Sequence, residues 1–591
     1  MAQPRFIVVG GGLAGLMTVI KICEAGYPVD LFSIVPVKRS HSVCAQGGIN
    51  ASVNIMGEGD SPQIHFYETV KGGDFLANQP LAKGMCEAAP GIIFLLDRMG
   101  VPFNRTPEGN LDFRRFGGTL FSRTAFVGAT TGQQLLYALD EQVRRYESEG
   151  LVEKYEFWDF CSVVLDGEGV CRGIVAQDLR TMELKVFPAD AVCLATGGNG
   201  IIYGRSTLSM VCDGAPASAV YQQGACYANG EFIQVHPTAI PGEDKLRLMS
   251  ESARGEGGRL WVPREGKPWY FLEEKYPKYG NLVPRDIASR EIFYVCRVLK
   301  LGVDGKDTVY LDVSHIPRET LDRKLGGILE IYEKFVGDDP RKIPMKVFPG
   351  VHYTMGGLWI DYEADGQGHP VVGSPRNHQS NLPGLFAAGE VDYEYHGANR
   401  LGANSLLSTF YAGMLCGPAM VSYARGLERG AAAAPSSLFE AERRRQQEAL
   451  DAIYRMDGSE NPFVIHKELG EIMTENVTVV RHNDKLQATD NAIRAFRERW
   501  RRINIHDATR WANQAVPFTR HLWHMLELAR VITLGALRRD ESRGAHYKPD
   551  FPERNDHQWL LTTKARWTPQ GPEFSYAPVD TSLLQPEVRK Y

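Results

Sequence analysis

The chain has 591 residues, which is too long for a single hydrophobic core, so its length predicts several domains. Its residues are 43% hydrophobic and 23% charged, values typical of folded globular proteins that argue against disorder or a coiled coil. The formal net charge is only −5, with 66 basic and 71 acidic residues spread along the sequence, so no nucleic acid partner is expected.

The first 33 residues predict a dinucleotide-binding β-α-β unit. Residues 6–9 and 29–32 are apolar and strand-like, and the sequence GGGLAG at 10–15 opens an apolar-periodic helix that runs to Gly26. In such a unit Gly10 permits the tight turn, Gly12 lets the backbone approach a pyrophosphate, and Gly15 lets the helix pack on the strand. A glycine-rich turn in an ordinary α/β domain is the alternative interpretation of this segment.

The residue that ends the second strand bears on the choice of dinucleotide. An NAD site usually has an acidic residue there for the ribose hydroxyls. This chain has Ser33 at that position and no carboxylate until Glu58 and Asp60. The pattern therefore favours FAD over NAD.

Neither a membrane span nor a cysteine-based centre is predicted. The N-terminal sequence MAQPRF lacks the pattern of a secretory signal, which predicts a cytoplasmic start. The most apolar stretch, residues 406–421, is shorter than the roughly 20 residues of a membrane helix and is interrupted by Ser408, Thr409 and Pro418. The ten cysteines stand singly without a CxxC pair, so we predict no metal site and expect most of them to be buried.

Residues 38–48, KRSHSVCAQGG, resemble the flavin-attachment loop of succinate dehydrogenase and fumarate reductase flavoprotein subunits. In that family the histidine that matches His41 is bonded through its ring to the flavin, whereas L-aspartate oxidases and soluble fumarate reductases lack it. Cys44 replaces the alanine that is commonest in this loop. Further blocks resemble the same family in order along nearly the whole chain: residues 230–238, 250–258, 284–286, 352–357, 388–390 and 397–405.

This resemblance implies a covalent FAD on His41 and a set of residues around the cofactor. The implied cofactor-binding residues are Gly10, Gly12, Leu13, Ala14, Gly15, Ser33, Lys38, Ser40, His41, Ser42, Gln46, Gly47, Gly48, Thr196, Gly197, Asp213, Glu390, Arg400, Ser405 and Leu406.

The resemblance also implies where a dicarboxylate binds. Arg400 and His352 would hold one carboxylate of succinate or fumarate. His236 and the hydroxyl of Ser250 would hold the other. Fixed positive charge and hydrogen-bond donors at both ends suit such a substrate, and arginine forks suit carboxylates best.

A proton must also move at the carbon next to the one that exchanges hydride with the flavin. From residue chemistry alone we would choose a histidine or a carboxylate, because a free guanidinium keeps its proton beyond about pH 12. The resemblance to the family instead implies that Arg285 moves this proton and that Arg254 and Glu251 supply the proton to it. Asp286 is expected to orient Arg285. A desolvated arginine between charged neighbours can share a proton, which makes this assignment physically acceptable.

We predict an α/β fold in which a Rossmann-like FAD-binding domain is split into residues 1–236 and 346–422. An inserted α+β capping domain spans 237–345, so the active site is expected at a domain interface, where closure would exclude water. A C-terminal helical domain at 423–539 follows from the charged helical pattern that begins at Leu438. A small C-terminal tail domain spans 540–591.

Nothing in the sequence can carry electrons away from a flavin, because there are neither clustered cysteines nor a CxxCH haem site. The resemblance implies an iron-sulfur subunit, a haem-containing membrane anchor and a quinone acceptor. Residues 250–253 and 267–276 resemble succinate dehydrogenases of menaquinone-using bacteria. We therefore favour succinate oxidation by a peripheral subunit on the cytoplasmic side of the cell (inner) membrane.

Three other functions stay open at this point. The chain could work physiologically as a fumarate reductase. It could be a soluble L-aspartate oxidase, which His41 and the context of Met355 and Leu401 oppose. It could also be a non-catalytic flavin-binding subunit, which is opposed by the full set His236, Glu251, Arg254, Arg285, His352 and Arg400.

Overall fold

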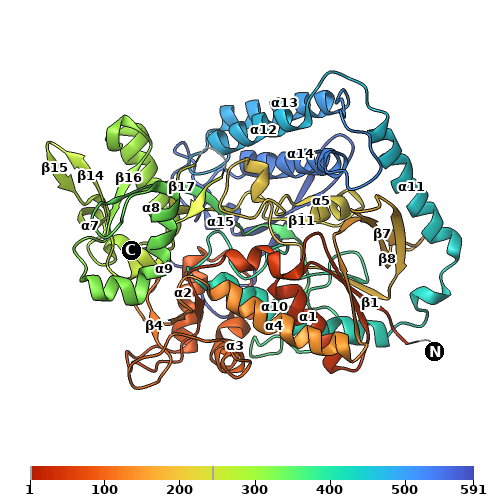
Figure 1. Ribbon diagram of the computed structural model, residues 1–591, viewed down its shortest axis with the longest axis horizontal. Helices are drawn as coiled ribbons and strands as arrows, with labels where there is room; N and C mark the ends of the chain where they lie inside the picture. The colour runs from red at the N-terminus through yellow and green to blue at the C-terminus, as the bar shows by residue number, and fades with distance from the viewer. Residues whose placement is uncertain (1–2, 243–244) are drawn as a thin grey trace.

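The computed structural model describes residues 3–242 and 245–591, so residues 1–2 of the predicted N-terminal segment and 243–244 of the predicted capping domain lie outside it (Figure 1). At its centre is a five-stranded sheet in which all neighbouring strands run parallel. In spatial order the strands are β19 (Leu385–Ala387), β10 (Ala191–Leu194), β1 (Phe6–Val9), β2 (Val29–Ser33) and β6 (Val152–Glu156). Helix α1 (Leu13–Glu24) connects β1 to β2, which confirms the predicted β-α-β unit.

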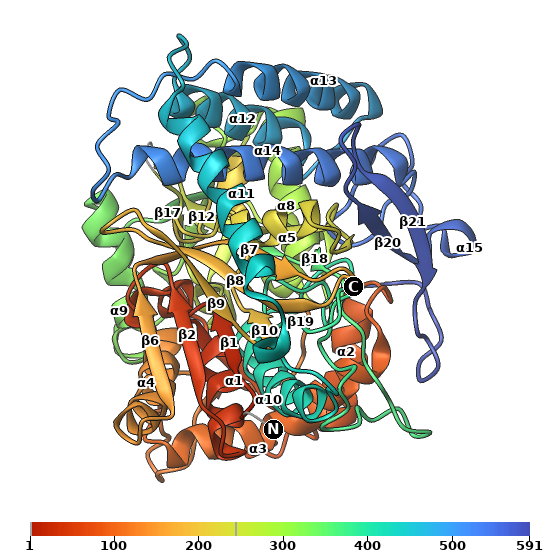
Figure 2. The same cartoon turned by 90° about the vertical axis from the view of Figure 1, so that its right-hand side faces the viewer.

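Alternate side chains of the central strands enter two different cores. Phe6 and Val8 of β1 pack with α1, α4 (Thr131–Ser148) and α10 (Asn404–Arg425), which lie together in the lower part of Figure 2. Ile7 and Val9 face the other core, formed with the antiparallel strands β7 (Trp158–Leu165), β8 (Cys171–Asp178) and β9 (Leu184–Pro188). Successive strand residues point to opposite faces, so a sheet covered on both sides must be apolar throughout.

Helix α10 contains the most apolar stretch of the sequence and packs against α1. Across residues 3–242 and 245–591, no helix combines the length and the apolar character that crossing a membrane requires. Nine cysteines are buried, as expected for most of them, and Cys44 is exposed.

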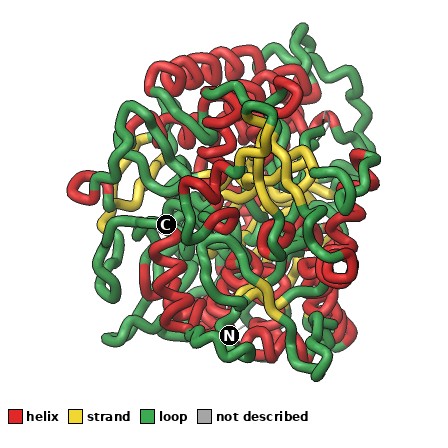
Figure 3. The backbone as a smooth tube through the Cα atoms, turned by 90° about the vertical axis from the view of Figure 1, so that its left-hand side faces the viewer, coloured by secondary structure: helices red, strands yellow, loops and turns green. Residues whose placement is uncertain are grey.

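A second sheet has six strands, all paired antiparallel. In order these are β13 (Arg247–Leu248), β12 (Ile233–Ile240), β17 (Met345–Thr354), β16 (Val309–Asp312), β14 (Arg259–Arg264) and β15 (Lys267–Trp269), seen from their own side in Figure 3. Around them lie α6 (Ser252–Gly255), α7 (Phe271–Lys275), α8 (Arg285–Phe293) and α9 (Arg318–Val336). This region has a hydrophobic core of its own, drawn from residues between 240 and 347. We call it the capping region.

Four long helices follow: α11 (Ser436–Tyr454), which runs down the right-hand side of Figure 1, and α12 (Pro462–Asn476), α13 (Asn483–Trp500) and α14 (Ala515–Arg538), which lie across its top. Helix α14 packs on α5 (Ala215–Gln222), which places its residues near the central sheet. Beyond it, α15 (Asp556–Trp559) precedes β20 (Leu561–Arg566) and β21 (Glu573–Pro578). Strand β20 pairs with β11 (Tyr227–Ala228), and β11 pairs with β18 (Gly357–Leu358), so the tail is joined to the body by a shared sheet.

The remaining α-helices and β-strands lie between β2 and α4 in the sequence. They are α2 (Pro62–Gly72), α3 (Gln79–Arg98), β3 (Ile49–Asn50), β4 (Phe113–Arg114) and β5 (Thr124–Ala125). The predicted α/β fold class is confirmed, and the positions of the domain boundaries stay predictions.

Candidate functional site

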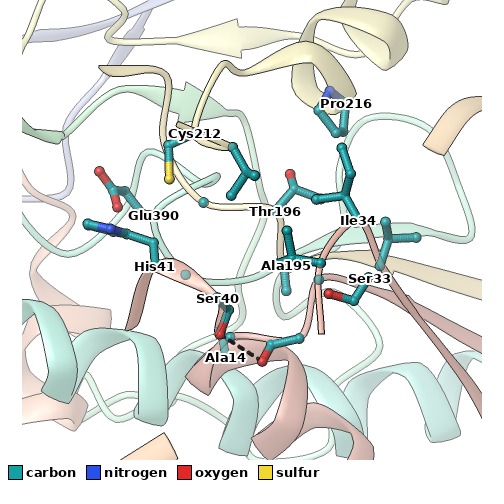
Figure 4. Close-up of a pocket in the computed structure, with 18 of the residues that line it drawn as sticks. Ala14, Ser33, Ile34, Ser40, His41, Ala195, Thr196, Cys212, Pro216 and Glu390 are labelled. Atoms are coloured by element: carbon teal, nitrogen blue, oxygen red, sulfur yellow. Dashed lines mark hydrogen bonds between the residues drawn. The ribbon is translucent and has the colours of Figure 1, made fainter. Parts of the chain in front are cut away.

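A long cavity opens where β1 meets α1. Its walls come from the β1–α1 turn, the ends of β2 and β10, and residues 388–390 after β19 (Figure 4). These are the carboxyl ends of parallel strands, where open α/β sheets bind ligands. The space between its walls amounts to about 900 Å³, part of which is open to solvent.

The glycines of the turn leave no room for larger side chains. A Cβ at Gly10, whose φ is 118°, would lie 2.1 Å from the carbonyl oxygen of Ala195. One at Gly15 would lie 1.9 Å from the carbonyl oxygen of Gly10, so Gly15 permits the close packing of helix on strand. Gly12 borders the cavity at the N-terminus of α1, where the helix dipole favours a negative group. The residues therefore fit a dinucleotide pyrophosphate.

His41 lies at one end of this cavity. Figure 4 shows His41 and Glu390 on the side opposite to Ser33 and Pro216. The Nδ1 atom of His41 accepts a hydrogen bond from the backbone N–H of Ser209 at 3.1 Å, which leaves Nε2 as the ring nitrogen able to form a bond. Removal from water, helped by the charge of Lys245, lowers the pKa of His41 to about 4, so its ring is neutral at pH 7.

A second cavity continues from this end. The two cavities share His41, Ser42, Glu390 and Thr409 in their walls. The second is lined mainly by polar and charged side chains, among them His236, Ser250, Glu251, Arg285, His352 and Arg400. A cofactor lying in the first cavity would thus end beside a charged chamber.

Strands β12 and β17 bring two of these side chains together. They pair antiparallel, with irregular register around His236 and Pro237, which has no N–H for the ladder. His236 from β12 and His352 from β17 face each other with ring centroids 4.9 Å apart. Arg400 enters from the loop before α10, with its guanidinium 4.4 Å from the ring of Tyr353.

Glu251 forms hydrogen bonds to two arginines, one through each of its carboxylate oxygens. Its Oε2 accepts hydrogen bonds from Nε of Arg285, at 2.9 Å, and from Nη2 of the same residue, at 2.5 Å. Its Oε1 accepts from Nη2 of Arg254 at 2.9 Å. Arg254 borders neither cavity and lies behind Glu251, where its Nη1 donates to the carbonyl oxygen of Asn281 at 2.7 Å. The three side chains form a continuous line from the chamber into the capping region.

Two donors at the chamber have no partner among residues 3–242 and 245–591. These are Nε2 of His236 and Nε of Arg400, both buried. The backbone N–H of Thr238 donates to Nδ1 of His236 at 3.2 Å, so the neutral ring carries its proton on Nε2. Buried donors without partners are costly, and a bound oxygen acceptor would satisfy them.

The charges in the chamber are predominantly positive. Burial, followed by the charge of Arg285, lowers the pKa of Arg400 to about 9. Burial and then the charge of Arg285 also keep the pKa values of His236 and His352 well below 6.5, so both rings are neutral. Burial alone would raise the pKa of Glu251, but Arg285 and Arg254 lower it below its usual value. A dianion would relieve the repulsion between the arginines.

The side chain of Asp286 forms its ion pairs with arginines other than Arg285. Asp286 does not orient Arg285 directly but pairs with Arg589, from the far end of the sequence, at 2.7 and 2.9 Å. Arg290, one turn further along α8, is 3.3 Å from Asp286. Consecutive residues at a helix start point in different directions, so adjacency in sequence does not give contact.

Most of the predicted cofactor residues gather around the two cavities. The first is bordered by Gly10, Gly12, Leu13, Ala14, Ser33, Ser40, His41, Ser42, Thr196, Gly197, Asp213 and Glu390. The second is bordered by Gln46, Gly47, Gly48, Arg400, Ser405 and Leu406. Lys38 borders neither: its Nζ lies 3.5 Å from Asp140 and the side chain is 44% exposed. Asp60 is also remote from the cavities and pairs with Arg123.

Sequence reasoning missed an ionic cluster in the wall of the first cavity. His521 of α14 lies between two carboxylates, with Nδ1 2.7 Å from Asp213 and Nε2 2.6 Å from Asp159. Burial lowers the pKa of His521, but Asp159 and Asp213 outweigh it and raise the pKa to about 10. Arg520 also contacts Asp159. No local signal marks these residues, because they come from distant parts of the sequence and α14 has only an ordinary helical pattern.

Fold and site together define a flavin-dependent oxidoreductase of the Rossmann type, in which a dinucleotide cavity opens onto a positively charged chamber. Two family models match the chain: an FAD binding domain over residues 5–406 and a fumarate reductase flavoprotein C-terminal domain over 466–591. The first alone spans more than half of the sequence.

Individual relatives agree with these matches. The succinate dehydrogenase flavoprotein subunit of Bacillus subtilis is 65% identical over 100% of this chain and 99% of its own length. The fumarate reductase flavoprotein subunit of Escherichia coli is 32% identical over 100% and 96%. A solved quinol fumarate reductase of Escherichia coli superposes with a TM-score of 0.89, at 31% identity over 99% and 98% of the two chains. The chain belongs to the family of succinate dehydrogenase and fumarate reductase flavoprotein subunits.

Proposed function

We propose that this chain is a catalytic flavoprotein subunit that interconverts succinate and fumarate, with FAD covalently held by His41. The observation that carries the proposal is the charged chamber, where Arg285, Arg400 and two neutral histidines meet beside His41. FAD, when bound, supplies a two-electron acceptor and donor of hydride. The 65% identity to the Bacillus subtilis succinate dehydrogenase subunit supports this activity over aspartate oxidation.

The chamber would bind a dicarboxylate through both of its carboxylate groups. Arg400 and His352 would bind one carboxylate, since Arg400 keeps an unpaired Nε and is fixed over Tyr353. His236 offers its Nε2 proton and Ser250 its hydroxyl to the other. Because these groups are buried and preorganised, binding fixes the substrate carbons next to the first cavity and displaces water.

Arg285 would exchange the proton at the substrate carbon. Its Nη1 donates to Gln234 at 2.9 Å and its other nitrogens to Glu251, so its guanidinium is held on two sides. Burial lowers the pKa of the neighbouring Arg254, which eases proton passage along the line Arg254, Glu251, Arg285. The same residues would serve fumarate reduction, because proton transfer at this site is reversible.

His41 would be bonded through Nε2. Its Nδ1 is occupied by the N–H of Ser209, and its low pKa keeps the ring unprotonated and nucleophilic. A covalent bond that raises the flavin potential favours succinate oxidation, since about 30 mV changes a two-electron equilibrium tenfold. In a denaturing gel of the purified chain, flavin fluorescence should travel with the wild type and be absent for His41→Ala. Loss of the flavin from the wild type would refute the attachment.

We further propose the partners and the domain division. Relatives with named functions are subunits of succinate dehydrogenases and fumarate reductases. An iron-sulfur subunit and a haem-containing membrane anchor would carry electrons to menaquinone and hold the chain peripherally on the cytoplasmic side of the membrane. The separate core of the capping region supports an inserted domain at 237–345. Size-exclusion chromatography of the detergent-extracted native complex, with cofactor analysis, tests the partner assignment.

A further inference from the structure

The last residues of the sequence lie against the capping region and not against the sheet of the tail. Figures 1 and 3 mark the C-terminus next to the capping region, and Figure 1 places it beside α8. Segment 587–591 follows β21 after a stretch without helix or strand. We call residues 587–591 the strap.

The strongest contact of the strap is with Asp286. Both terminal nitrogens of Arg589 reach the two carboxylate oxygens of Asp286, at 2.7 and 2.9 Å. The side chain of Asp286 is 1% exposed and that of Arg589 is 8% exposed. Burial lowers the pKa of Arg589, but Asp286 outweighs it and raises the pKa well above its usual value. This is a buried, bidentate ion pair, which orients its partners strongly.

The strap also touches two separate regions of the fold. The ring of Tyr591 stacks edge-on against Tyr279, with centroids 5.1 Å apart, and joins the rim of the capping core. On the other side, Nζ of Lys71 from α2 lies 5.7 Å from the centre of the Tyr591 ring, and the hydroxyl of Tyr67 donates to Glu587. The strap therefore bridges α2 and the capping region.

Asp286 is the second residue of α8, and Arg285 is the first. The N-terminus of α8 can shift only if Asp286 moves with it, since the two residues share a peptide bond. We propose that the strap is a positioning device for the proposed proton donor: Arg589 holds Asp286, and thereby fixes Arg285 against Glu251. This inference rests on the proposed role of Arg285.

Loss of Arg589 would leave Asp286 with Arg290 as its nearest cation, at 3.3 Å and 28% exposed. A buried carboxylate without its main partner moves toward water or toward another cation. A displacement of about 1 Å in a catalytic group can lower turnover about 100-fold. The binding groups Arg400, His352 and His236 lie on other elements and do not touch the strap.

The test uses the holoenzyme with its partner subunits, assayed for succinate oxidation with a dye acceptor. We expect Arg589→Ala to lower kcat about 10- to 100-fold, with little change in the dissociation constant of malonate, a dicarboxylate that cannot be oxidised. Arg589→Lys should recover part of kcat, because lysine restores the charge but not the fork. Lys590→Gln, a change at an exposed residue of the same strap without contact to Asp286, should leave kcat unchanged.

Two further measurements separate positioning from general damage. Amide hydrogen exchange over residues 285–293 should rise in Arg589→Ala and stay unchanged in Lys590→Gln. In a double-mutant cycle, Arg589→Ala should have little further effect on kcat in an Asp286→Asn background. Additive effects, or equal losses of kcat and malonate affinity, would overturn the positioning role.

Arg285→Lys distinguishes failure of this inference from failure of the proposed function. If Arg285→Lys keeps full turnover, the proposed role of Arg285 is wrong. If Arg285→Lys abolishes turnover but Arg589→Ala does not change it, only the strap inference is wrong.

Discussion

Replacement of Glu251 by glutamine tests the arginine relay most sharply. The carboxylate of Glu251 is fully buried and accepts from Arg285, Arg254 and the backbone N–H of Gly117. Glutamine keeps the shape but loses the charge and offers an NH₂ group to one of the arginines. Two guanidiniums, 5% and 0% exposed, would then face each other without their counterion.

The expected cost follows from this burial. Removing one partner of a buried ion pair typically destabilises a protein by about 3–5 kcal/mol. Loss of a group that passes protons typically lowers the rate by about 10²–10⁴. We therefore expect a lower midpoint of urea denaturation and at least about a 100-fold fall in succinate-dependent dye reduction for Glu251→Gln.

Glu273→Gln is the matched control in the same region of the chain. Glu273 also forms a two-bond pair with an arginine, Arg259, at 2.8 and 2.6 Å, but the two side chains are 33% and 37% exposed. Its loss should cost less than about 1 kcal/mol and leave turnover unchanged. Equal turnover in Glu251→Gln and the wild type would refute the relay, and equal stability changes in the two variants would refute the burial argument.

Three other predictions address the cofactor cavity. Gly10→Ala should abolish flavin retention on the purified chain, because the new Cβ would overlap the carbonyl group of Ala195. Gly91→Ala should retain the flavin, because a Cβ at that position would have no atom within 4 Å. His521→Gln should lower the thermal midpoint most below pH 6.5, and the difference from the wild type should shrink as pH rises toward 10. A group whose pKa is raised in the folded state stabilises the fold only while it is protonated. A difference in thermal midpoint that does not change with pH would contradict this prediction. His41→Ala should spare fumarate reduction more than succinate oxidation in paired dye assays, and full succinate oxidation would contradict this.

The parts of the molecule that could be predicted from sequence are those with a local signal. The β1–α1 turn is such a case, because Gly10 and Gly15 are required by contacts within one β-α-β unit. The roles of Arg254 and Arg285 came from a resemblance and not from pattern, since an isolated arginine beside a turn is more often a surface ion pair.

The parts that could not be predicted depend on contacts between distant segments. His521 reaches Asp213 from α14, and Arg589 reaches Asp286 from the end of the sequence. Neither pair leaves a periodic or spaced signature. Adjacency in sequence was misleading for Asp286, which follows Arg285 but bonds to Arg589 of the strap. A matching motif was misleading for Lys38, which lies outside both cavities. Long-range ion pairs of this kind are fixed by tertiary packing alone.

The most direct test of the account is the response of the bound flavin to substrate in the absence of oxygen. Succinate added to the purified holoenzyme should bleach the flavin absorbance, and an excess of fumarate should restore it, because, as we propose, the chamber beside His41 binds both dicarboxylates. A flavin that stays oxidised with succinate but is bleached by L-aspartate would contradict the proposed function.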